Sequence, residues 1–296
     1  AEYYAQRASA GLLITEGVFI NEMAVGYINV PRIQTVEQRD SWRQVANKVH
    51  AAYGKIFMQI WHVGASSHPD LLGGNLPLSP SGINPNIKVY THDGFVDTVT
   101  PKIMSLSEIH STIKDFGIAA KNAIDAGMDG IEIHAANGYL INQFFQKSTN
   151  NRTDYYGGSI ENRARLLFDI LDEIINIIPI DRVGIRFSPR LDDLGVKYDD
   201  ETEDLYRYIT QRIENDYKVA YLHFNGIIST KIKTEPEQVI DIAKCMREDY
   251  SGTLMINTGL TKEISEQLLN DGYADLFSFG IPFIANPTFV EKLKND

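Results

Sequence analysis

The amino-acid sequence of 296 residues predicts an α/β fold, a TIM (β/α)8 barrel whose first strand is missing from this chain. Short β-branched runs alternate with amphipathic segments, which is typical of right-handed βαβ units around a parallel sheet. Seven strands can be counted, and a helix-like stretch, EYYAQRASA, comes before the first of them. Barrels of ~250 residues form single domains, so the length suits one barrel that lacks a strand.

The expected strands are short and nearly continuous apolar runs, as parallel strands covered on both faces should be. They lie at residues 12–15, 55–61, 130–134, 182–187, 219–224, 253–257 and 275–280.

Amphipathic patterns between the strands predict the helices, at residues 41–53, 107–126, 160–178, 202–217, 236–250 and 261–271. Ser105 and Thr261 stand ahead of acidic residues, where helix N-caps are expected, and Pro236 suits a first helical turn. Glycines in DAGMDG and NDGYAD mark two of the helix ends.

An open doubly wound sheet is the alternative architecture. No GxGxxG follows the first strand, so the main sign of a dinucleotide-binding sheet is missing.

We expect one domain over residues 1–296. The irregular stretch 62–105, rich in Gly, Pro, Ser and Asn, follows the second strand and is expected to form a lid on the carboxyl face.

Composition narrows the class of function. A net charge of −11 and a pI near 5.1 argue against nucleic acid as a partner. The only cysteine is Cys245, so neither a disulfide framework nor a thiolate metal site is expected, which favours a cytoplasmic protein without a metal. No apolar run approaches the ~20 residues that span a bilayer, and no signal peptide is visible. Because the chain opens on AEYYAQ without a methionine, we expect the gene product to begin upstream.

Polar or glycine residues stand at the ends of all seven strands, where parallel barrels carry their chemistry. One such residue is more often structural, but that interpretation is strained for seven strands in succession. The residues are Thr15, Glu16, Gly17, Gln59, Trp61, His62, His134, Arg186, Tyr221, His223, Asn257, Thr258, Gly259 and Gly280.

Two of these residue types suit a flavin. The amide of Gln59 can donate and accept, as the imide edge of a flavin requires, and the guanidinium of Arg186 would stabilise an anionic reduced ring. An ion pair between Arg186 and an acidic residue is an equally weighted alternative. The stretches NTG and FGIP after the last two strands suit close backbone approach to a phosphate.

The sequence resembles the Old Yellow Enzyme family of FMN-dependent ene-reductases. The resemblance covers most of the chain in the family's order. It is carried by YYAQRASAGLLITEG, VPRIQTVEQ, KIFMQIWHVG, HAANGYLINQFFQKSTNNRTDYYGGSIENRAR, IRFSP and ADLFSFGIPFIANP.

The resemblance implies a role for each matching position. His134 and Asn137 would hydrogen-bond the carbonyl or nitro oxygen of a small enone-type substrate, and Tyr139 would donate the proton. The implied FMN contacts are Gly17, Gln59 and Arg186 at the ring, and Thr258, Gly259, Gly280 and Ile281 near the phosphate. Tyr27, Trp61 and Tyr221 are expected pocket walls, although aromatic residues in such places are more often core.

The implied reaction explains these residue types. NAD(P)H reduces FMN, and hydride then passes to the β-carbon of the activated alkene. Two donors can stabilise the charge that develops on the substrate oxygen, and a phenol is a suitable acid toward an incipient enolate. A monomer or homodimer is expected, without a membrane partner. By contrast, NRTDYYGGSIENRAR is interpreted as structural, with Gly157 and Gly158 in a turn, Ser159 or Asn151 as a cap, and arginines tying the loop to a helix.

The sequence departs from the family pattern in three places. The opening strand is absent, the chain stops at EKLKND before the usual tail, and Ile281 stands where the family has an arginine for the FMN phosphate. An impaired or degenerate barrel that binds FMN weakly or not at all is therefore the alternative function.

Overall fold

The structure, a computed structural model, describes residues 1–295 and contains the predicted parallel sheet. Seven strands follow the order β1-β2-β7-β8-β9-β10-β11, and every neighbouring pair is parallel. They are β1 (Leu13–Phe19), β2 (Ile56–Trp61), β7 (Gly130–Ala135), β8 (Val183–Phe187), β9 (Tyr221–Asn225), β10 (Leu254–Asn257) and β11 (Leu276–Ser278). The seven expected strands are confirmed, with ends shifted by a few residues.

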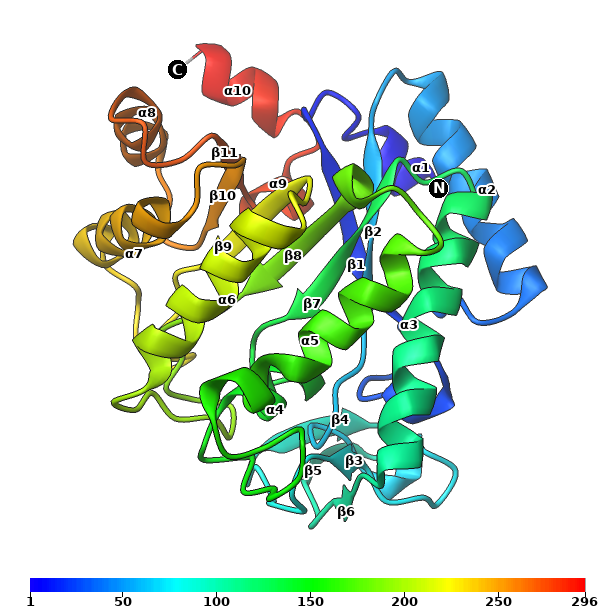
Figure 1. Cartoon of the computed structure of the whole chain (residues 1–296). Helices are drawn as coiled ribbons and strands as arrows, with labels where there is room; N and C mark the ends of the chain where they lie inside the picture. Colours follow the sequence, from blue (N-terminus) through cyan, green and yellow to red (C-terminus); the bar gives the residue numbers. More distant parts are fainter. Residues whose placement is uncertain (296) are drawn as a thin grey trace.

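Helices surround the outer side of this curved sheet (Figure 1). The six predicted ones are α2 (Val36–Ala51), α3 (Leu106–Asp125), α5 (Ile160–Ile175), α6 (Thr202–Asp216), α7 (Pro236–Asp249) and α8 (Lys262–Asn270). Helix α2 begins five residues earlier than predicted, because Thr35 and Gln38 form a reciprocal capping box at its start. The expected cap at Ser105 is also present, with Glu108 completing the box.

Some elements were not predicted. Helix α4 (Leu140–Phe145) is buried at every residue, so its sequence has no polar face to show a helical period. Short helices α9 (Ile281–Ala285) and α10 (Phe289–Asn295) lie near the C-terminal end, whereas α1 (Glu2–Ala5) falls within the helix-like stretch expected before the first strand. The 62–105 stretch is less irregular than expected: it holds β3 (Leu78–Ser79) with β6 (Lys102–Ile103) and β4 (Lys88–Thr91) with β5 (Gly94–Asp97). It lies beyond the carboxyl end of β2 (Figure 1).

The sheet does not close into a full barrel. Among the strands described in residues 1–295, β1 neighbours β2 alone and β11 neighbours β10 alone, so the place of one strand between them is open, although Phe19 at the end of β1 also forms an isolated bridge with Arg32. Arg7 crosses this region, since its Nε donates to the carbonyl of Phe283 (2.9 Å) and its Nη2 to that of Ile284 (2.7 Å). A buried guanidinium thus ties the start of the chain to helix α9.

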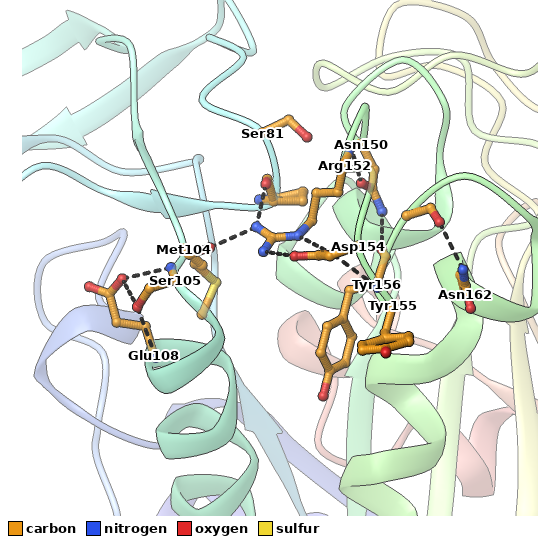
Figure 2. A network of polar contacts seen from close by, with 12 residues as sticks. Ser81, Met104, Ser105, Glu108, Asn150, Arg152, Asp154, Tyr155, Tyr156 and Asn162 are labelled. Carbon is orange, nitrogen blue, oxygen red and sulfur yellow. Dashed lines mark hydrogen bonds and ion pairs between the residues drawn. The ribbon is translucent and has the colours of Figure 1, made fainter.

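The loop before α5 is structural, in agreement with the sequence interpretation. Figure 2 shows Arg152 between the carboxylate of Asp154 and the carbonyl of Met104, which belongs to the 62–105 stretch. Ser159 caps α5, and Gly158 has a φ of +84° in the preceding turn. These contacts hold the 62–105 stretch against the barrel. No helix within residues 1–295 is long and apolar enough to cross a membrane.

Candidate functional site

The interior of the barrel is polar at two successive levels of the strands. Along β7, Glu132 and His134 alternate with Ile131 and Ile133, and side chains two residues apart share a face of a strand. Glu132 forms hydrogen bonds with side chains from β2 and β9. Because side chains of separate strands meet across the inside of a barrel, this face of β7 is the interior one. One level contains Gln59, Glu132 and Tyr221, and the next contains Trp61, His134, Arg186 and His223.

Glu132 is the centre of the first level, and sequence reasoning missed it. Its Oε1 accepts from Gln59 Nε2 at 2.7 Å, and its Oε2 lies 2.8 Å from His223 Nδ1 and 3.1 Å from Tyr221 Oη. The signal available in the sequence was an acid in the middle of the apolar run GIEIH. An acid between residues that the strand buries must itself be buried, and a buried carboxylate needs hydrogen-bond partners. The sequence could therefore have indicated a buried polar group at this position.

Tyr221 can reach Glu132 because the strand between them carries a glycine. Gly184 lies beside both residues in the sheet register. A Cβ at Gly184 would lie 2.2 Å from Tyr221 Cζ, so only glycine leaves room for the ring. Tyr221, an expected pocket wall, therefore lies at the level of Glu132 and is 2% exposed.

His134 is held as a neutral hydrogen-bond donor. Burial, reinforced by the charge of Arg186, lowers the pKa of His134 to about 3. Its Nδ1 is 3.3 Å from the backbone nitrogen of Ala136 and accepts that N–H. The single ring proton of the neutral imidazole is consequently on Nε2.

Asn137 is held with its amide nitrogen free. The residue has a φ of +59°, and its Oδ1 accepts from Ser188 Oγ at 2.8 Å and from Asn225 Nδ2 at 2.9 Å. Ser188 Oγ in turn accepts from the Asn137 backbone N–H at 3.1 Å. Because the oxygen takes both bonds, the amide is oriented with Nδ2 as the donor available to a ligand.

Tyr139 lies among aromatic rings next to His134. Its hydroxyl is 3.1 Å from that of Tyr27, and its ring centroid is 5.0 Å from that of His134 and 4.8 Å from that of Trp61. Burial, with a contribution from Tyr27, raises the pKa of Tyr139 well above its usual value. The ring of Trp61 also lies against Gly17, where a Cβ would come within 2.1 Å of Trp61 Cε3.

Arg186 has capacity to bind a further group. Its Nη2 donates to Asn257 Oδ1 at 2.9 Å, while its buried Nε has no partner among residues 1–295. The ion pair considered as the alternative for Arg186 is not formed within those residues; the carboxylate of Glu132 acts on it only through its field. Gln59 Oε1 is likewise without a hydrogen bond there, since Nε2 is the atom that contacts Glu132. A free N–H and a free amide oxygen fit the acceptor oxygens and imide N–H of a flavin.

The expected phosphate residues divide into two groups. Thr258 (φ +78°) donates its Oγ1 to Asn225 Oδ1 at 2.5 Å, and Gly259 (φ +68°) follows it, so this turn is joined to the network around Asn137. Gly280 and Ile281 lie apart from the buried residues, and Ile281 is 84% exposed.

The chain is similar to known proteins over nearly its whole length. The model of the NADH:flavin oxidoreductase / NADH oxidase family matches residues 1–296. The chain is 37% identical to 12-oxophytodienoate reductase 7 of Oryza sativa subsp. japonica over 310 residues, covering 99% of this chain and 78% of that protein.

Two solved structures share the fold over nearly the whole chain. Morphinone reductase in complex with tetrahydroNAD superposes with a TM-score of 0.90 at 37% identity, covering 99% of this chain and 80% of that one. The Old Yellow Enzyme homologue from Zymomonas mobilis gives a TM-score of 0.90 at 36% identity, covering 99% and 82%.

Proposed function

Because this chain belongs to the NADH:flavin oxidoreductase / NADH oxidase family, that of Old Yellow Enzyme, we propose that it reduces the alkene of α,β-unsaturated carbonyl or nitro compounds. It is an NAD(P)H-dependent FMN oxidoreductase. The observation that carries the finer proposal is the pair of donors, His134 Nε2–H and Asn137 Nδ2–H, beside the protonated phenol of Tyr139.

In this proposal the two donors bind the oxygen of the substrate. Negative charge grows on that oxygen as the β-carbon is reduced, and donors already aimed at it stabilise the charge without reorganising. Ser188 and Asn225 keep Asn137 in the donating orientation. The neutral state of His134 leaves it a donor at every pH above its lowered pKa of about 3.

Tyr139 supplies the proton to the α-carbon. Its raised pKa keeps the phenol protonated at neutral pH, so the proton is present when substrate arrives. Tyr27, within hydrogen-bond distance of the same hydroxyl, and Trp61 form walls of the substrate pocket, with Tyr221 beneath them.

The chemistry that bound FMN supplies is hydride transfer from NAD(P)H to the substrate's β-carbon. We assign its ring contacts to Gly17, Gln59 and Arg186, of which Arg186 and Gln59 have unpartnered polar atoms within residues 1–295. The phosphate would lie near the backbone of Thr258, Gly259, Gly280 and Ile281.

The partners proposed for the enzyme are a small-molecule substrate and a nicotinamide reductant, NADH or NADPH. The net charge of −11 disfavours nucleic acid. We further propose a single cytoplasmic domain that is a monomer or a homodimer.

A visible absorption spectrum tests the proposal directly. The purified chain is incubated with FMN, freed of excess flavin, and treated first with NADPH or NADH and then with cyclohexenone. We expect flavin absorption that bleaches with the reductant and returns with the enone. Bleaching without return would contradict ene-reduction.

A chain that stays colourless would favour the second candidate, an impaired barrel that does not retain FMN. The exposure of Ile281 at the expected phosphate position is the observation behind that candidate.

A further inference from the structure

The carboxylate of Glu132 is entirely enclosed, at 0% exposure, yet no part of the proposed reaction uses it. Three neutral groups donate to it: the Gln59 amide, the Tyr221 hydroxyl and the His223 imidazole. Within residues 1–295 no cation lies in contact with it, and the nearest positive charge that influences it is Arg186. Burying an ionised carboxylate without a cation in contact is energetically costly, which indicates a role for Glu132 other than packing.

The acid is ionised in the folded protein. Burial opposes ionisation most strongly, but His223, the charge of Arg186 and the hydrogen bond from Gln59 outweigh it and lower the pKa of Glu132 to about 2. Burial also lowers the pKa of His223, so the imidazole is neutral. Its single N–H is on Nδ1 and donates a hydrogen bond to Glu132.

A chain of hydrogen bonds fixes the carboxylate in place. With Nδ1 as the donor, His223 Nε2 must accept, and it lies 2.7 Å from Ser278 Oγ on the half-buried strand β11. Ser278 therefore donates to His223, and His223 donates to Glu132, which only accepts. Oε2 is held by His223 and Tyr221, which leaves Oε1 for Gln59 alone.

We propose that Glu132 is a positioning residue of the flavin site: its Oε1 holds the Gln59 amide with nitrogen inward and oxygen free for an imide N–H, and its charge opposes that of Arg186. A carboxylate can only accept hydrogen bonds, so the NH2 group of the Gln59 amide must face it. A neutral partner that both donates and accepts would permit either the NH2 group or the oxygen to face it. The inference rests on the proposed function, because it concerns how the chain holds FMN.

The negative charge has a predictable effect on reduction. Arg186 favours electrons on the flavin, and a fixed anion on the same wall of the barrel disfavours them. Removing the charge should make reduction easier and raise the midpoint potential. A tenfold change in the reduction equilibrium corresponds to about 30 mV for a two-electron couple.

Two substitutions separate the charge from the contact. Glu132→Gln keeps the length of the side chain and an oxygen for Gln59 but loses the charge. Glu132→Asp keeps the charge but is one methylene too short to maintain the contact with Gln59. Glu266→Gln is the matched control, because it makes the same chemical change at an exposed position of helix α8.

The measurements are the midpoint potential of bound FMN and the FMN dissociation constant from flavin fluorescence quenching, with circular dichroism to verify folding. We expect E132Q to favour reduction about tenfold, and E132D to bind FMN about tenfold more weakly at a nearly unchanged potential. E266Q should resemble the wild type in both. A folded E132Q with wild-type potential would overturn the charge role, and wild-type affinity in E132D would overturn the positioning role.

Failure of the proposed function has a different signature: the wild-type chain itself would then bind no FMN, or its reduced flavin would not be reoxidised by cyclohexenone.

Discussion

His134 and Asn137 each have one polar atom occupied by the protein and one left to donate. The occupied atoms are His134 Nδ1, which accepts from the Ala136 backbone, and Asn137 Oδ1, which accepts from Ser188 and Asn225. The remaining N–H groups belong to side chains five and two residues before the proposed acid, Tyr139. At the scale of single residues, neighbouring acceptors and donors therefore determine what each side chain can do.

The double variant His134→Ala/Asn137→Ala tests this pair. Each lost donor should lower the rate of alkene reduction on the order of a hundredfold, as removal of an oxyanion donor does, and binding of phenol ligands should weaken in parallel. Stopped-flow reoxidation by cyclohexenone and a phenol titration measure the two effects. The double variant His110→Ala/Asn176→Ala, at exposed positions, is the control. Alkene reduction at the full rate in H134A/N137A would show that the pair is wrongly assigned.

The buried histidines also predict how stability depends on pH. Burial lowers the pKa of His62 and of His134 to about 3, from 6.5 in an exposed imidazole. Below pH 6.5 the unfolded chain binds protons that the folded chain does not. Each histidine thus contributes stability that is fully present above pH ~6.5 and lost as the pH falls toward ~3, by up to about 1.4 kcal/mol per pH unit.

Urea unfolding between pH 7 and pH 4 measures this slope. His134→Asn should flatten the fall in the free energy of unfolding, while His110→Asn at an exposed position should leave it as it is. Equal slopes in the wild type and H134N would mean that His134 is not held neutral by burial.

At the scale of elements, the strands act by alternation. Outward positions of β7 are isoleucines in the core under the helices, and inward positions carry the polar groups of the site. The polar levels depend on a shared register, because Gln59, Glu132, Gly184 and Tyr221 come from four strands. A change of one residue in register would turn every inward group outward.

Gly184→Ala should disrupt the level that contains Gln59, Glu132 and Tyr221 without altering any polar group. The new Cβ would lie 2.2 Å from Tyr221 Cζ, and forcing an extra methyl into a packed interior costs about 1–3 kcal/mol of stability. Chemical denaturation measures the loss. Gly11→Ala is the control, since no described atom lies within 4 Å of its Cβ position. If both variants lose the same stability, the close packing of Tyr221 on Gly184 is not the cause.

At the scale of the whole molecule, the open place between β1 and β11 is the dominant feature. Open edges of parallel sheets are uncommon in barrels, whose closure normally removes them. Arg7 and helix α9 span this region through two backbone carbonyls. The proposed flavin site is built mainly on β2, β7, β8 and β9, away from the opening, while the expected phosphate positions at Gly280 and Ile281 border it.

Ile281→Arg should strengthen FMN binding. The family resemblance implies an arginine at this position, and a charge-assisted contact to the phosphate is worth roughly 1.5–3 kcal/mol, or about tenfold to a hundredfold in affinity. Fluorescence titration with FMN measures the change. Ile284→Arg is the control, because Ile284 is also exposed and lies in the same short helix. An equal gain in I284R would indicate general charge attraction and contradict a specific phosphate contact.

Local features of the sequence were sufficient to predict the seven strands and six of the helices, because periodicity, caps and strand ends are properties of neighbouring residues, whereas the roles expected in the loop after β7 came from the family resemblance. Helix α4 was missed because its residues are all buried and show no period. Only the tertiary structure revealed the contacts of Glu132, the tautomer of His134 and the orientation of Asn137. The contacts of Glu132 with Gln59 and His223 join residues 73 and 91 positions apart, and no local pattern encodes a hydrogen bond over such separations. Burial, which sets the charge of each group, is likewise established only when all the strands are assembled.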